Sequence, residues 1–298
     1  ARQTVGPELE KRIQILINTG LIELRNDFKI YWDRFAIARL TPGKDYLSPK
    51  FELIVDDILE SNQKQKLIIF IENWLKNKIG VILKSLIELK DLKEKNSSIK
   101  ALAYQLYENN GVLKRDLVSD YLKNLGQEER KILRDLGVKF GRYHVFLFKL
   151  IKPEAVSLRT LLWKNYHQKY FELMPPTFGL NFLDEKKLKS KNFMLLCGFE
   201  KFENFYVRID ILERLFMKII NSNSDKEKEI KLVPEMLNLL GCTKDNFKKL
   251  LKNMHYKVIE KNNEIYFRYM PKKVVKKSFN KKDTKESPFG ILKNMSFN

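Results

Sequence analysis

Apolar residues at spacings of three and four recur along most of this 298-residue chain and predict helices. The longest such pattern runs from Gln65 to Lys93, where Trp74, Leu75 and Ile79 share one helical face. Most of the shorter patterns end at glycine or polar turns, which are common helix C-termini. We predict further helices over residues 7–18, 51–59, 99–108, 114–125, 128–136, 154–170, 211–220, 234–240 and 243–253.

Runs rich in aromatic and β-branched residues interrupt the helical patterns. Residues 22–40 predict a small hairpin or extended arms, and residues 195–210 read as extended. Two further runs, Tyr256–Glu260 and Glu264–Met270, follow two helices and meet at Asn262 and Asn263. Helix, turn, helix and hairpin outline a winged-helix-like unit. The predicted fold class is therefore mainly α, with helical accessory domains, short β-hairpins and a winged-helix-like C-terminal unit.

Composition divides the chain further. The run Met174-Pro175-Pro176 followed by Gly179 marks the main boundary, and lysine dominates the end of the chain. We predict a connector with a short helix and a β-hairpin (1–47), a helical accessory domain (48–173), a smaller α+β winged-helix-like domain (174–270) and a basic, largely disordered tail (271–298).

The formal net charge of +20 predicts a polyanionic partner, and nucleic acid is the first candidate. The alternative is a biased, lysine-rich composition without a binding role. Because no stretch of 18 residues is uniformly apolar, we expect no membrane span. Cys197 and Cys242 are the only cysteines, which favours a reducing, cytoplasmic setting.

The common catalytic motifs are absent from the sequence. It contains no GxxxxGK[ST] phosphate loop, no DExH box, no HExxH and no GxSxG. Its three histidines and two cysteines show no zinc-ligand spacing. We therefore expect no catalytic residue, bound cofactor or metal in this chain.

Cations interleaved with aromatic residues remain as the candidate chemistry. Arginine and lysine neutralise phosphates, while aromatic faces stack on unpaired bases. The competing interpretation is that the cations only form a solvated surface and that the aromatic residues belong to the hydrophobic core. The richest run is Leu133–Trp163, and we expect its glycine-punctuated middle to form a strand-facing loop. The predicted nucleic-acid-binding residues are Arg39, Lys139, Arg142, Lys152, Arg159, Arg208, Lys248 and Lys252.

Four blocks of the sequence are similar to a known family. They are RFAIARLTPGKDYLSPKFELIVDD (34–57), ALAYQLYENNGVL with LRDLGVKFGRYHVFLFKLIKPEAVSLRTLLW (101–163), YVRIDILERL (206–215), and PEMLNLLGCTKDNFKKLLKNMHY with SPFGILKNM (234–256 and 287–295). In this order they resemble the region C-terminal to the motor in alphaproteobacterial ATP-dependent superfamily-two helicases, the DExH kind related to the mitochondrial degradosome RNA helicase. The second block is the most specific.

The resemblance implies an accessory region of an RNA helicase that contacts single-stranded RNA and packs against motor domains on its N-terminal side. ATP and Mg²⁺ would then belong to the parent protein and to no residue of this chain. The chain begins at Ala1 rather than at a methionine, and we expect a fragment of a longer protein. Two alternatives stay open: a free-standing nucleic-acid-binding or adaptor protein of winged-helix type, and a protein-interaction scaffold.

Overall fold

The computed structural model describes residues 2–55, 57, 59–92, 97–184, 190–221 and 229–270. About 52% of the described residues are helical and 22% lie in strands, which form four small antiparallel sheets. The prediction of a mainly α fold is therefore wrong, and the protein is mixed α/β. Most strands are only two to four residues long, too short for an alternating pattern to stand out in the sequence. The predicted disordered tail lies outside the described residues.

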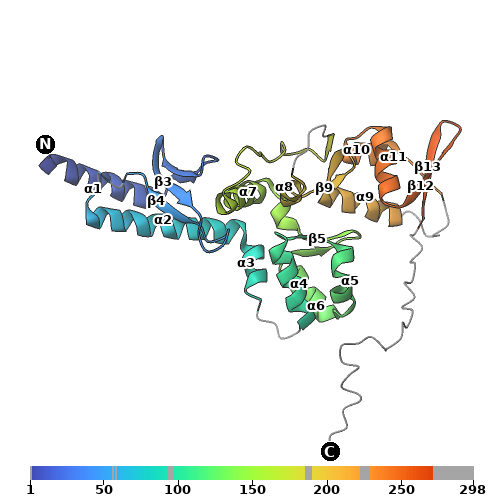
Figure 1. The fold of residues 1–298 in the computed structure, drawn as a ribbon, viewed down its shortest axis with the longest axis horizontal. Coiled ribbons are helices and arrows are strands. Elements are labelled where there is room, and N and C mark those ends of the chain that lie inside the picture. The colour runs from blue at the N-terminus through green and yellow to red at the C-terminus, as the bar shows by residue number, and fades with distance from the viewer. Residues whose placement is uncertain are drawn as a thin grey trace, which may run out of the picture.

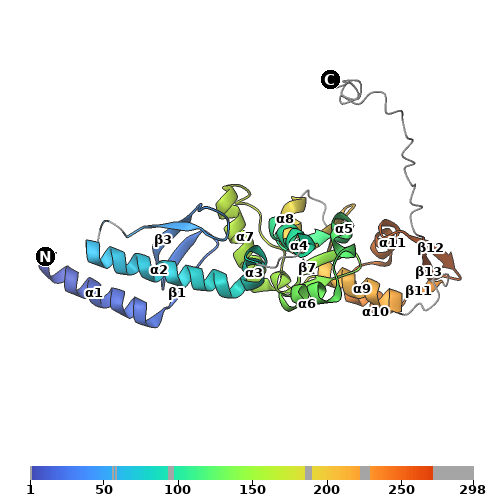
Figure 2. The ribbon, with the colours of Figure 1, turned by 90° about the horizontal axis from the view of Figure 1, so that it is seen from below.

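The N-terminal part combines two long helices with a four-stranded sheet (Figures 1 and 2). Helices α1 (Arg2–Thr19) and α2 (Ser61–Ile82) pack together, and the strands follow in the order β1 (Ile22–Leu24), β2 (Lys29–Trp32), β3 (Phe35–Thr41) and β4 (Lys50–Leu53). The predicted helix over 51–59 is thus wrong. Phe51 pairs with Leu40 across β3 and β4, so strand pairing overrides the local helical pattern.

The long helix predicted for residues 65–93 is two helices. Helix α2 ends at Ile82, the backbone of Leu83 leaves the helical region (φ −106°, ψ 21°), and α3 (Lys84–Lys90) begins directly after it. Leu83 is fully buried, so the break still keeps the apolar face on the core.

Three units with the same connectivity form the rest of the described chain. Unit I contains α4 (Ser97–Glu108), β5 (Val112–Lys114), a 3-10 turn (Arg115–Val118), α5 (Ser119–Lys123), α6 (Gln127–Asp135), β6 (Val138–Phe140) and β7 (His144–Leu147). After a second 3-10 turn (Phe148–Ile151), unit II contains α7 (Pro153–His167), β8 (Phe182–Asp184), α8 (Lys191–Leu196), β9 (Phe199–Phe202) and β10 (Phe205–Arg208). Unit III contains α9 (Ile209–Asn221), β11 (Ile230–Lys231), α10 (Pro234–Leu240), α11 (Lys244–Asn253), β12 (Tyr256–Lys261) and β13 (Glu264–Tyr269).

Each unit places its last strand in the middle of its sheet. The sheet orders are β5-β7-β6, β8-β10-β9 and β11-β13-β12, all antiparallel. Units I and III have two α-helices between the first strand and the hairpin, and the described part of unit II has one. Helix, strand, helical segment and hairpin is the order of elements that winged-helix units share. The helix, turn, helix and hairpin expected near the C-terminus are present as α10, α11, β12 and β13.

A repeated backbone detail supports the equivalence of the units. The residue before the first hairpin strand has positive φ in all three: Gly137 (94°), Gly198 (84°) and His255 (63°). In each unit the carbonyl of that residue accepts a hydrogen bond from the N–H that follows the last strand, at 3.4, 2.9 and 2.8 Å. The chain therefore contains three copies of one supersecondary unit.

The hydrophobic core follows this division only in part. One cluster extends from Ile13 to Leu162 and joins the N-terminal sheet, the long helices and unit I, so it includes residues of both predicted domains 1–47 and 48–173. A second cluster belongs mainly to unit III and a third to unit II. The units are thus separate in topology but packed side by side, as Figure 1 shows.

Candidate nucleic-acid interface

The turn between β6 and β7 lies against helix α9 of unit III. At Gly141 an added Cβ would lie 2.4 Å from Oε2 of Glu213, so the close approach needs glycine. The turn also closes on itself, because the N–H of Gly141 donates to the carbonyl of His144 at 2.8 Å. The glycine of the predicted strand-facing loop is therefore required by packing against a carboxylate.

The carboxylate of Glu213 binds the backbone of this turn. Oε1 accepts the N–H groups of Tyr143 at 2.9 Å and His144 at 2.7 Å, and Oε2 accepts the N–H of Arg142. Nδ1 of the His144 ring also lies 3.0 Å from Oε1. One buried carboxylate from α9 thus satisfies three consecutive N–H groups and an imidazole.

His144 links this carboxylate to a second one. Its Nε2 lies 3.2 Å from Glu200 of β9, and Lys114 of β5 reaches the other oxygen of Glu200 at 2.7 Å. Burial alone would lower the pKa of His144, but its hydrogen bonds to Glu200 and Glu213 outweigh burial and raise that pKa above its ordinary value. Burial would raise the pKa of Glu200, yet the hydrogen bonds from His144 and Lys114 hold it below its ordinary value.

We call these four residues, Lys114, His144, Glu200 and Glu213, the clasp. They come from all three units, so the clasp joins the units at one point. Two carboxylates face an ammonium and an imidazole whose pKa is raised, so the group is balanced in charge when His144 is protonated. Sequence reasoning missed both glutamates. The available signal concerns Glu213 alone, which shares the apolar helical face of Ile209, Leu212 and Phe216.

Arg142 points outward from the turn that the clasp holds. Its side chain is exposed, and its guanidinium carbon lies 5.9 Å from the ring centroid of Tyr269 at the end of β13. This separation is within the range of cation–π attraction. The predicted loop therefore presents an arginine from a backbone fixed by hydrogen bonds, beside a partly exposed aromatic ring of β13.

Arg159 is not available to a ligand. It is fully buried on α7, where its guanidinium donates to the carbonyls of Asn110 (2.6 Å), Leu150 (3.0 Å) and Leu196. Burial lowers its pKa to about 10. Its proposed phosphate contact is corrected to a structural role, because the three carbonyls belong to different segments of units I and II.

The other predicted cations do not form one surface. Arg208 is held by Asp210 (2.7 and 3.2 Å), and Lys248 lies 2.7 Å from Glu260 and 3.7 Å from Asp245. The remaining four are exposed but lie on separate elements: Arg39 on β3, Lys139 on β6, Lys152 before α7 and Lys252 on α11. In Figure 1, β3 and α11 lie toward opposite ends of the molecule.

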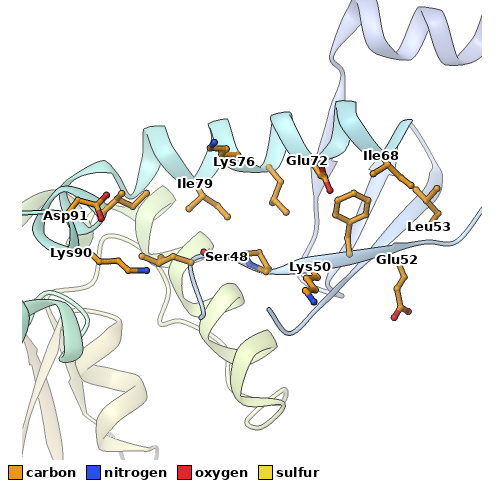
Figure 3. Close-up of a pocket in the computed structure, with 15 residues that line it drawn as sticks. Ser48, Lys50, Glu52, Leu53, Ile68, Glu72, Lys76, Ile79, Lys90 and Asp91 are labelled. Atoms are coloured by element: carbon orange, nitrogen blue, oxygen red, sulfur yellow. The ribbon is translucent and has the colours of Figure 1, made fainter. Parts of the chain in front are cut away.

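A groove of about 870 Å³ lies elsewhere, between β4 and helices α2 and α3 (Figure 3). None of the eight predicted cations lines it. Its charged side chains are balanced, with Lys50, Lys76 and Lys90 against Glu52, Glu72 and Asp91. The groove therefore offers no marked preference for a phosphate chain.

Two negative findings apply to the described part of the chain. No group of three or more His, Cys, Asp and Glu side chains is placed to hold a metal ion. No helix there has the length and apolar character needed to cross a membrane. Comparison with protein-family models, with curated proteins and with solved structures finds no match to this chain.

Proposed function

We propose that this chain is a nucleic-acid-contacting accessory region of an ATP-dependent RNA helicase, with the motor located elsewhere in the parent protein. The observation that supports it most is the exposed Arg142, presented beside Tyr269 by a turn whose N–H groups are all held. A preorganised cation next to an aromatic ring suits a phosphate followed by an unpaired base. The net charge of +20 would add salt-sensitive attraction.

A salt titration of single-stranded RNA binding tests this proposal. Affinity should fall steeply with salt, and Arg142→Ala should weaken binding and reduce the slope of log K against log salt by roughly 0.7, the value for one phosphate contact. Arg134→Ala is the matched control, since Arg134 is an exposed arginine on α6 that also lies 5.9 Å from an aromatic ring. Binding that is absent at low salt, or equal losses in both variants, would contradict the role of Arg142.

The ATP and Mg²⁺ of the proposed function belong to the parent's motor. We expect the isolated chain to hydrolyse no ATP, because its sequence lacks both the phosphate loop and the DExH box. RNA-stimulated ATPase activity in a pure sample would contradict this. A cytoplasmic setting is part of the same proposal, consistent with its two cysteines, neither of which is in a disulfide.

The alternative is a free-standing nucleic-acid-binding or adaptor protein of winged-helix type. It is favoured by the repeated unit, because each copy contains a three-stranded sheet of its own. The upstream genomic sequence separates the two. An in-frame GxxxxGK[ST] followed by a DExH box supports the helicase, and a start codon directly before Ala1 supports the alternative.

A further inference from the structure

Exposed apolar side chains gather in one short segment of unit II. Of the nineteen large hydrophobic residues exposed in the described part of the chain, six lie between residues 166 and 180. They are Tyr166, Tyr170, Phe171, Met174, Phe178 and Leu180. Contiguous exposed apolar surface often marks a binding site, so the contacts within this segment matter.

The segment is also unusually long for its place in the fold. Fourteen residues, 168–181, separate α7 from β8 without helix or strand, whereas unit I uses three residues, 109–111, at the same position. Structureless connections of this length in compact proteins are commonly functional. The added residues are thus an insertion into the repeated unit.

Its first part is held in a defined conformation. The side chain of Lys164 donates to the carbonyl of Leu173 at 3.0 Å, and the N–H of Leu173 donates to the carbonyl of Tyr170 at 3.0 Å. Tyr170 has a φ of 62°, which is rare for an aromatic residue and costs free energy. The fold keeps this strained residue at the surface, where 41% of it is exposed.

The strained backbone places Tyr170 flat against Trp163. Their ring centroids are 5.5 Å apart with an interplanar angle of 18°. His167 lies 4.7 Å from Trp163 on the same helix end, and Tyr166 meets His167 edge-on at 5.2 Å. We call these four residues, Trp163, Tyr166, His167 and Tyr170, the aromatic platform. Tyr166, His167 and Tyr170 are exposed, and the half-buried Trp163 contacts His167 and Tyr170.

Cations stand beside the aromatic platform. Lys169 is exposed between His167 and Tyr170, and no carboxylate of the described residues lies within ion-pair distance of it. Phe171 packs edge-on against Phe28 at 5.4 Å, next to the strand pair in which Lys29 lies opposite the exposed Arg39. Lys29 is itself paired with Asp27 (3.8 Å), so Lys169 and Arg39 are the exposed cations here. Aromatic faces bordered by exposed cations suit a single nucleic-acid strand, whose bases stack while its phosphates are neutralised.

We propose that the aromatic platform stacks unpaired bases of a single-stranded nucleic acid, a second contact separate from Arg142. This inference rests on the proposed function and assigns a base-binding site within it. The first part of this segment presents a stacked ring face beside an exposed lysine, which is the combination that single-strand sites use. The strain at Tyr170 then has a role, since it holds a ring face toward the strand.

The test compares a short oligouridylate with an abasic phosphodiester of equal length, using the full chain. Tyr170→Ala should weaken oligouridylate binding about tenfold and leave abasic binding nearly unchanged, because only bases stack. Tyr170→Phe should retain affinity. Tyr104→Ala is the matched control, an exposed tyrosine on α4 outside the segment (60% exposed), and should have no effect.

A second readout does not depend on a variant of the platform. In a chain with Trp32→Phe and Trp74→Phe, Trp163 is the only tryptophan, and oligouridylate but not the abasic chain should quench its fluorescence. If Tyr170→Ala lowers the melting temperature, and so perturbs folding, the binding test uses His167→Ala in place of Tyr170→Ala. Equal losses for both ligands, or no loss for either, overturn the inference. Unchanged oligouridylate binding with weakened association to a protein partner would assign the surface to protein docking. If the unmodified chain binds neither ligand at low salt, the proposed function fails instead.

Discussion

Replacing Glu213 by alanine removes the carboxylate on which the three units meet. The side chain is buried, and it accepts three backbone N–H groups and contacts the ring of His144. The alanine variant leaves these donors without a partner and leaves His144 with Glu200 alone. Hydrogen bonds to a charged acceptor contribute about 1.5–3 kcal/mol each, but they are not additive. Breaking one side of a buried ion pair costs about 3–5 kcal/mol, and we expect Glu213→Ala to fall in that range.

The glutamine variant separates charge from shape. Glu213→Gln keeps one acceptor oxygen but loses the negative charge and part of the acceptor capacity, so about 1–3 kcal/mol is expected. Glu108→Ala is the matched control, because Glu108 is exposed at the end of α4 and should change stability by less than about 0.5 kcal/mol.

Hydrogen exchange reports on the clasp directly. The amides of Arg142, Tyr143 and His144 should lose protection in Glu213→Ala, while amides of α2 keep theirs. Thermal unfolding followed by circular dichroism supplies the overall stability. Unchanged protection of the three amides, with a melting temperature equal to that of Glu108→Ala, would refute the interpretation of Glu213 as the joint.

Gly141 offers a double-mutant cycle on the same contact. Gly141→Ala should destabilise the unmodified protein by about 1–3 kcal/mol, because its Cβ meets the fixed carboxylate at 2.4 Å. In the Glu213→Ala background the carboxylate is absent, so Gly141→Ala should cause little further loss of stability. Additive effects of the two changes would contradict the contact.

Three further predictions follow from buried groups. The folded-state pKa of His144 is raised, so its contribution to stability is complete below its unfolded pKa of about 6.5 and is lost as pH rises through the folded pKa. The folded-state pKa of Glu200 is lowered, so its contribution to stability is complete above its unfolded pKa of about 4.3 and is lost as pH falls through the folded pKa. Melting temperature against pH should therefore peak between these limits, and His144→Gln should flatten the alkaline side. Arg159→Met should cost about 3 kcal/mol or more in unfolding, since three carbonyls lose their donor, while salt dependence of RNA binding stays unchanged. Burial raises the pKa of Cys242 to about 11, so a maleimide at neutral pH should label it far more slowly than free cysteine.

Helices with a clear apolar period could be predicted from the sequence, and α9, α10 and α11 lie close to their expected bounds. The hairpin at Asn262 and Asn263 was also predictable, because both residues adopt positive φ, which asparagine tolerates. The strands of unit I were not predictable from periodicity, since β5 and β6 have three residues each. The repeat was hidden for a related reason. Its marker residue is glycine in two units but His255 in the third.

The site residues differ in how much of their surroundings could be predicted from the sequence. Arg159 lies among buried residues on nearly every side of α7, so its sequence context could have indicated burial. Its partners could not be predicted, because the three carbonyls come from distant segments. Arg142 differs, since its loop is punctuated by Gly141 and its exposure agrees with the expectation. The sequence contained no sign that Glu213, seventy-one residues later, holds that loop.

The run Leu133–Trp163 therefore separates its charges by environment. Arg159 donates hydrogen bonds to backbone carbonyls, and His144 lies between two carboxylates, whereas Arg142 remains exposed. Because the N–H of Arg142 is itself bound by Glu213, the position of this exposed arginine depends on the docking of unit III. If Arg142 contacts a strand, a change that loosens the clasp lowers affinity without removing any surface cation. Binding and the arrangement of the three units are then one coupled equilibrium.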